Sequence, residues 1–252
     1  MRWSYQIGRL FGIPIRVHLS LIAMMGLTAL LGGGLSGLVL TATLFGSVLV
    51  HELGHALVAR SKGLPISDIS LYPFGGMARM LAAPQRSGDE IAIAAAGPAV
   101  SFALGACLWI LSAVSGQVVL WWMAEMNLVL GAFNLLPALP MDGGRILRAL
   151  LARRMGYYRS TVLAARIARY LAMGLALAGV FLSGWLVLIA FLVFFMSAAE
   201  QAQAMARLRA GDPGYIDDGP EVLPPERPAV PGAHRVYRDR FGNRIVVEWR
   251  ER

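Results

Sequence analysis

Residues 37–59 read GLVLTATLFGSVLVHELGHALVA, a run of 23 residues without Lys, Arg or Asp. A helix needs roughly 20 mostly apolar residues to cross a bilayer. This run is long enough, and its ionisable side chains are confined to His51, Glu52 and His55 near its C-terminal end. We therefore predict a transmembrane helix that carries three polar side chains which an ordinary span would exclude.

The rest of the chain also has the composition of a membrane protein. Of its 252 residues, 57% are hydrophobic and 15% are charged, whereas a typical soluble domain has about 25% charged residues. The long stretches that lack Lys and Arg are candidates for transmembrane helices. Together with the helical run that precedes the last of these stretches, they are long enough for six such helices. We expect these helices near 17–32, 37–59, 91–114, 118–136, 162–181 and 185–199.

Arginine marks the cytoplasmic side, because short loops rich in Lys and Arg stay in the cytoplasm. The turns expected at 32–37, 115–117 and 183–184 hold no charged residue, while the opposite helix ends hold most of the arginines. We predict a multi-pass protein of the cytoplasmic membrane with both termini in the cytoplasm. The net charge of +8 then lies beside anionic lipid, which argues against nucleic acid as a partner.

His51 and His55 are four residues apart, so they lie on one helix face and can bind one metal ion, for which zinc is expected. Glu52, one step round the helix, borders the same site. The alternative is that the pattern arose by chance. It is opposed by the cost of a charged side chain at the membrane centre, about 2.5–3.5 kcal/mol.

A catalytic zinc site generally has three protein ligands and an open position, so a third ligand must come from another segment. Asp142 is the best candidate. It follows residues 134–141, where two prolines end the fourth helix, and it precedes Gly143 and Gly144, which allow a sharp turn. Irregular backbone at membrane depth is tolerated where it is buried or lines a wet cavity. Alternatively, Asp142 caps a helix at 145–154.

These two motifs resemble those of the site-2 protease family of intramembrane zinc metalloproteases. The first motif is His51-Glu52-Leu53-Gly54-His55, and the second comprises Asn134, Pro137 and Asp142-Gly143. The resemblance covers about residues 5–200. Further matches are Phe74-Gly75-Gly76-Met77-Ala78, Gly97-Pro98, Ser101 and Asn127.

The resemblance implies that His51, His55 and Asp142 hold one zinc ion per chain. Glu52 would then accept the proton of the attacking water and pass a proton to the leaving amine. Asn134 would hydrogen-bond the substrate backbone or the tetrahedral oxygen, or it would instead satisfy the interrupted backbone beside it.

We expect a zinc-dependent endopeptidase that cuts membrane-spanning protein substrates in regulated intramembrane proteolysis. The alternative is a non-catalytic membrane protein, either a metal transporter or a pseudoprotease. A transporter would line its path with several polar residues, but only Glu52, Glu125 and Asp142 lie in or beside the spans, and a pseudoprotease would have lost Glu52 or a ligand. Glu125 has no assigned role, and a second copy of the chain or a regulatory membrane protein is compatible as a partner.

Residues 64–81 are too apolar for a solvent loop and read as a small membrane-associated β-hairpin, with strands at 66–72 and 77–81. Its open edge could pair with an extended substrate segment. The alternative is a plug at the cytoplasmic mouth.

We therefore predict an all-α polytopic membrane protein with one small hairpin in its membrane domain and a second in its tail. The division is a six-span membrane protease domain at 1–210, a Pro/Gly-rich linker at 211–233 and a cytoplasmic hairpin tail at 234–252. About 40 residues cannot house a PDZ or cystathionine-beta-synthase-type domain. The resemblance is therefore to the compact prokaryotic type.

Overall fold

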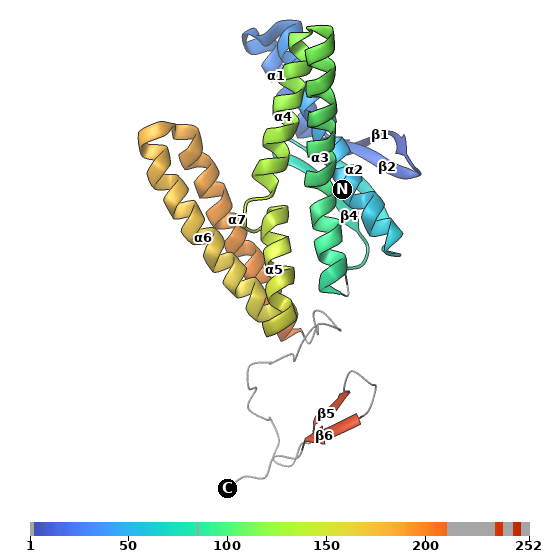
Figure 1. Cartoon of the computed structure of the whole chain (residues 1–252), viewed down its shortest axis with the longest axis vertical. Helices are drawn as coiled ribbons and strands as arrows, with labels where there is room; N and C mark the ends of the chain where they lie inside the picture. The colour runs from blue at the N-terminus through green and yellow to red at the C-terminus, as the bar shows by residue number, and fades with distance from the viewer. Residues whose placement is uncertain (1–2, 85, 211–234, 239–243, 248–252) are drawn as a thin grey trace.

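The computed structural model describes residues 3–84, 86–210, 235–238 and 244–247, and it is mostly helical (Figure 1). The helices are α1 Leu19–Thr28, the π-helical turn η1 Ala29–Gly33, α2 Gly34–Ser61, α3 Ser87–Ser115, α4 Val118–Asn134, α5 Asp142–Met155, α6 Tyr157–Leu182 and α7 Gly184–Arg209. The strands are β1 Ser4–Leu10, β2 Ile13–His18, β3 Ile66–Tyr72, β4 Gly75–Met80, β5 Arg235–Arg238 and β6 Arg244–Val247.

Four of the helices, α2, α3, α6 and α7, are long and apolar enough to cross a membrane, and α1 and α4 are shorter apolar helices. Their outer faces are lined with exposed large apolar side chains, among them Leu30, Val114, Phe181 and Trp185. Continuous apolar surface of this kind is rare on soluble monomers. The expectation of a polytopic membrane protein is thereby confirmed.

The helices form two groups that α5 joins. Helices α1 to α4 pack together around α2 and α3, while α6 and α7 form an antiparallel pair that leans away from them (Figure 1). Helix α5 packs on α3 on one side and on α6 on the other. Its first residue, Asp142, therefore lies where the two groups meet.

The N-terminal residues form two strands, β1 and β2, that were not expected from the sequence. Strand β2 pairs antiparallel with β1 and parallel with β3, and β3 pairs antiparallel with β4, so the sheet order is β1-β2-β3-β4. The hairpin expected at 66–81 exists, but it is half of a four-stranded sheet and not an isolated hairpin. The first helix accordingly begins at Leu19 instead of residue 17, and the His18 side chain caps it by accepting from the Ser20 amide.

The sheet is fixed to the helices by the apolar side chains of β2 and β3. Ile13 and Ile15 on β2 and Ile69 on β3 are buried against Ala56 of α2. Burying large aliphatic side chains of this kind stabilises a fold by about 1.5–3 kcal/mol each. The sheet is therefore held against the half of α2 that carries the histidines.

The segment between α4 and α5 is irregular, as expected, and two glycines make its path possible. A Cβ atom on Gly143 would lie 2.1 Å from the Leu135 carbonyl oxygen, and one on Gly144 would lie 2.4 Å from the Ala138 carbonyl carbon. Both glycines are thus required by close backbone approach, whereas a sharp turn was the expected reason for them. This packing fixes the start of α5.

The C-terminal hairpin is present as β5 paired antiparallel with β6, with Val236 opposite Val246. The linker expected at 211–233 and the turn of this hairpin lie outside the described residues. The proposed division of the chain at 1–210, 211–233 and 234–252 stays a prediction.

Candidate metal centre

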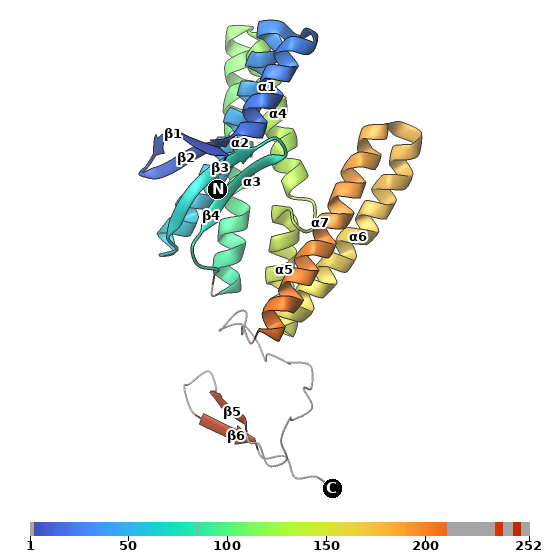
Figure 2. The same ribbon diagram turned by 180° about the vertical axis from the view of Figure 1, so that it is seen from behind.

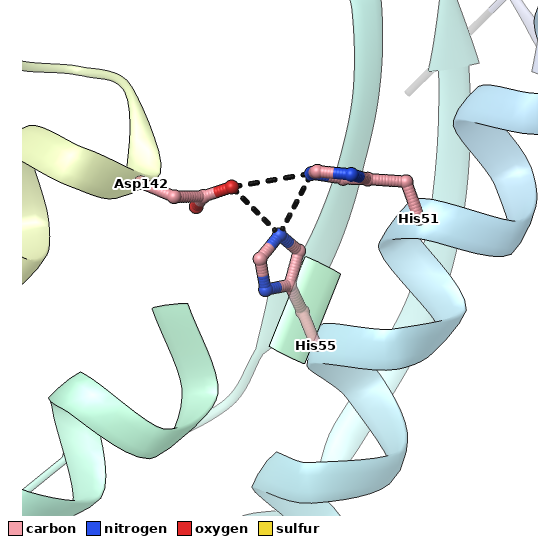
Figure 3. A group of neighbouring side chains, drawn as sticks. All are labelled: His51, His55 and Asp142. Atoms are coloured by element: carbon pink, nitrogen blue, oxygen red, sulfur yellow. Dashed lines mark hydrogen bonds and ion pairs between the residues drawn. The ribbon is translucent and has the colours of Figure 1, made fainter. Parts of the chain in front are cut away.

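Three side chains from two distant segments converge on one point (Figure 3). His51 and His55 come from successive turns of α2, and Asp142 is the first residue of α5. His51 Nε2 lies 3.1 Å from His55 Nε2, and Asp142 Oδ2 lies 3.1 Å and 3.2 Å from these two nitrogens. All three residues are buried. They form a possible metal-binding site, as the motif spacing predicted.

The spacing of the three ligand atoms fits a tetrahedral zinc ion. With zinc–nitrogen and zinc–oxygen bonds of about 2.0–2.2 Å, ligand atoms at two corners of a tetrahedron are about 3.3–3.6 Å apart. The observed separations of 3.1–3.2 Å lie just below the short end of this range, so a small outward movement of the side chains would accommodate the ion. Two imidazoles and one carboxylate leave a fourth corner for water or substrate.

The outer nitrogen of each imidazole is held by α3. His55 Nδ1–H donates to the Ile93 carbonyl oxygen at 2.7 Å, and His51 Nδ1 lies 2.9 Å from the Ser101 hydroxyl oxygen. An Nδ1–H that donates a hydrogen bond orients the ring and leaves the Nε2 lone pair for a metal ion. These two contacts therefore explain why both Nε2 atoms face the same point.

Ser101 and Ile93 were missed as partners of the histidines, although the sequence contains a signal. Ile93, Gly97 and Ser101 are four residues apart and so share one face of α3. The resemblance to the site-2 protease family identifies Ser101 as a family position but assigns it no partner. Which face of α3 meets α2 is decided by tertiary packing, and the periodicity of α3 alone does not show it.

Gly97 lies directly beneath the converging nitrogens. A Cβ atom added to it would lie 2.3 Å from His55 Nε2 and 2.6 Å from His51 Nε2. Any other residue would push a carbon atom against the Nε2 atoms of both histidines. The lack of a side chain at this position is thus part of the site.

Glu52 is not one of the converging ligands. Its Oε2 accepts a hydrogen bond from the Ala78 backbone amide of β4 at 2.9 Å, and its Cγ lies 2.4 Å from the place of a Cβ on Gly76. The carboxylate is therefore held against the sheet, beside the metal ligands and one residue away from His51. This position fits a proton carrier better than a metal ligand.

Asp142 does not cap α5. The N-cap residue is Met141, without a side-chain capping bond. The Asp142 carboxylate faces the two histidines with Oδ2, and its Oδ1 lies 3.7 Å from Arg145 Nη1. The carboxylate is thus placed where it could bind a metal ion together with the histidines, and Arg145 compensates part of its charge.

The other polar residues of α4 lie apart from the three ligands. Asn134 is half-buried and its Nδ2 donates to the Leu130 carbonyl oxygen at 2.9 Å, so a role in substrate binding stays a prediction. Asn127 is buried and donates to the Ser47 hydroxyl at 3.0 Å, which ties α4 to α2 one turn before His51. Glu125 is half-buried, and its carboxylate makes no hydrogen bond or ion pair within the described part of the chain.

Comparisons with known proteins agree with this geometry. Residues 39–119 and 113–175 match the family described as Peptidase family M50. The chain is 41% identical over 210 residues to a zinc metalloprotease of Methanocaldococcus jannaschii, covering 80% of this chain and 61% of that protein. It is 35% identical over 263 residues to the Rip3 protein of Mycobacterium tuberculosis, covering 86% and 67%.

The fold also matches a solved structure, the site-2 protease from Methanocaldococcus jannaschii. The TM-score is 0.62 at 38% sequence identity, and the match covers 79% of this chain and 95% of that chain. The described membrane region thus has the architecture of that structure. The chain spans 61% and 67% of the length of the two curated relatives above.

Proposed function

The chain belongs to peptidase family M50, the site-2 protease family, and on this premise we propose that it is an intramembrane zinc metalloendopeptidase. It hydrolyses peptide bonds in or near the transmembrane segments of single-span or other membrane proteins. The observation that carries the proposal is the convergence of His51, His55 and Asp142 within 3.2 Å of one another, beside a carboxylate that is not a ligand.

We place the protein in the cytoplasmic membrane with six spans and both termini in the cytoplasm. Helix α4 has 17 residues, and α1 with η1 has 15, which correspond to about 26 Å and 22 Å of helix. They accompany the longer α2 and α3 in one group (Figure 1). The arginines at the ends of α2, α5 and α7 support a cytoplasmic location for these ends.

The chemistry is divided between the metal ligands and Glu52. Zinc, when bound by His51, His55 and Asp142, supplies a Lewis acid that lowers the pKa of water towards about 7. Glu52 accepts the proton of the attacking water and then donates a proton to the amine that leaves. Its hydrogen bond to Ala78 restrains the carboxylate on the side of the ligands that faces the sheet. The proton therefore has a fixed carrier next to the point where the ligands meet.

The substrate must be partly unwound, because a peptide bond inside a helix is shielded from attack. Backbone amides in a strand alternate between its two edges. The Ala78 amide donates to Glu52, and the Leu81 amide donates to the Pro65 carbonyl beside β3. The amides of Gly76, Ala78 and Met80 therefore point away from β3, at the edge where Glu52 lies. We propose that an extended substrate segment pairs with this edge by strand addition.

Removal and restoration of zinc test the proposal. Purified full-length protein in detergent is expected to cut a membrane-spanning substrate internally, to lose this activity when a chelator removes the metal, and to regain it with zinc. Metal content is measured in the same samples. Internal cleavage that continues at an unchanged rate in metal-free protein would contradict the proposal, as would a zinc-loaded protein that cuts no spanning substrate.

A further inference from the structure

A cavity of about 640 Å³ lies beside the metal centre, between the edge strand β4 and helices α5 and α7. Figure 2 shows β4 on one side of this region and α5 with α7 on the other. One wall is the continuous run of residues 77–84. The opposite wall is formed by side chains of α3, α5, α6 and α7, mainly Glu90, Arg145, Arg148, Tyr157, Glu200 and Arg207.

The cavity touches the candidate site on both walls. Ala78, in the strand wall, holds Glu52 through its amide, and Arg145, in the helix wall, lies 3.7 Å from the Asp142 carboxylate. From there the cavity runs towards Arg207 near the end of α7, which is the cytoplasmic end in the proposed topology. A peptide that leaves the metal centre along β4 would therefore enter it.

The lining of the cavity carries more positive than negative charge. Four arginines and two glutamates face it. Arg148 and Glu90 form a buried ion pair, and Glu200 lies 3.7 Å from Arg148 Nη1. Arg79 is paired with Asp68, and Arg145 with Asp142 and Glu90. Arg207 is exposed and has no ion-pair partner among the described residues, so its guanidinium is free to bind an acidic ligand.

We propose that this cavity binds the part of the substrate that continues from the scissile bond towards the cytoplasm, and that it selects segments carrying Asp or Glu. The inference rests on the proposed function and names its substrate class. The edge of β4 pairs with the main chain of any sequence, so sequence preference must come from the opposite wall. There, the exposed guanidinium of Arg207 attracts carboxylates.

This preference would discriminate strongly among membrane proteins. Most transmembrane segments carry Lys or Arg on their cytoplasmic side. A basic cavity repels such flanks, and a like-charge contact is an effective way to reject a wrong partner. Spans with an acidic cytoplasmic flank would be cut, whereas the more common basic-flanked spans would be spared.

A charge reversal at the rim tests the inference. Three substrates are compared that share one span and differ only in a flank with two Asp, two Asn or two Lys. Purified full-length wild type is expected to cut the Asp substrate with a kcat/KM about two- to tenfold above that of the Lys substrate, mainly through KM. Arg207→Glu is expected to abolish or reverse this order. The preference is also expected to weaken as salt rises.

Arg209→Glu is the matched control. Arg209 is exposed on the same helix, two residues further on, and does not line the cavity. It changes the net charge equally, so its flank preference is expected to match the wild type. Equal rates on all three flanks in the wild type, or equal effects of the two variants, would overturn the inference.

The Asn substrate separates the two possible failures. If the wild type cuts it in a zinc-dependent manner without any flank preference, the inference about the cavity is wrong and the proposed function stands. If the wild type cuts none of the three substrates, the proposed function itself has failed.

Discussion

Replacing Gly97 with alanine would put one methyl carbon into the metal centre. The added Cβ would lie 2.3 Å from His55 Nε2 and 2.6 Å from His51 Nε2, whereas ordinary contacts begin at 3.4 Å. Each imidazole would have to move by about 1 Å. A metal site tolerates only about 0.2 Å in its ligand distances, so the displacement exceeds the tolerance several-fold.

The expected result is a folded protein without zinc. Gly97→Ala should fall from about one zinc per chain to less than about a tenth, and internal cleavage should fall with it. Zinc is measured by elemental analysis of purified full-length protein, and folding by circular dichroism and gel filtration in detergent. A cleavage assay runs on the same samples.

Gly105→Ala is the matched control on the same helix. Its Cβ would lie 2.9 Å from Leu128 Cδ2 and 3.2 Å from the Ala124 carbonyl oxygen, so it crowds the packing of α3 on α4 and touches no ligand. Overpacking of this kind costs about 1–3 kcal/mol. This variant should lose thermal stability and keep its zinc. A folded Gly97→Ala protein with a full complement of zinc would refute the geometry of the site.

Three further predictions concern the surroundings of the site. Ser101→Ala removes the hydroxyl beside His51 Nδ1 and is expected to weaken zinc retention about 10- to 100-fold in competition with a chelator; unchanged retention would show that the hydroxyl does not orient the ring. Burial raises the pKa of Asp68, but hydrogen bonds from Ser70 and Ser67 and the charge of Arg79 outweigh it, so the pKa is lowered below 3.8. The stability that this carboxylate contributes is therefore present above about pH 4 and lost as the pH falls through its folded pKa. Thermal melts should show that Asp68→Asn is less stable than the wild type at pH 7, and the difference in melting temperature should shrink towards pH 3. Reporter fusions after Gly33, Gly116 and Gly184 should report the outer side and fusions after Arg154 and Arg235 the cytoplasm, and an outer location for Arg154 would invert the topology.

The two histidines were predictable from the sequence because the rule that pairs them is local. Residues four apart share a helix face, and ionisable side chains are costly in an apolar span and therefore indicate a functional site. Asp142 was predictable as a candidate because Pro137, Pro140 and the two glycines after it break the helix at membrane depth. In both cases the signal lies within about ten residues of the side chain.

The features that were missed depend on contacts between distant segments. Ile13, Ile15 and Val17 alternate with other residues and could have indicated β2, but their partner β3 lies about fifty residues away, and the run merges with the apolar helix that follows. The ion pair between Glu90 and Arg148 joins α3 to α5 across 58 residues. Neither the charge pattern of α3 nor that of α5 identifies the other helix as its partner.

The most direct test of the central claim compares Glu52→Gln with Glu125→Gln, with cleavage and zinc measured in the same samples. The glutamine oxygen at position 52 can still accept from the Ala78 amide, so the side chain should keep its place. The protein should keep its zinc. Loss of the proton carrier is expected to slow cleavage by about 10²- to 10⁴-fold, while Glu125→Gln, with no proton to carry, should cut at close to the wild-type rate. If Glu52→Gln retains most of the cleavage rate with one zinc per chain, Glu52 is not the proton carrier and the account of this site is wrong.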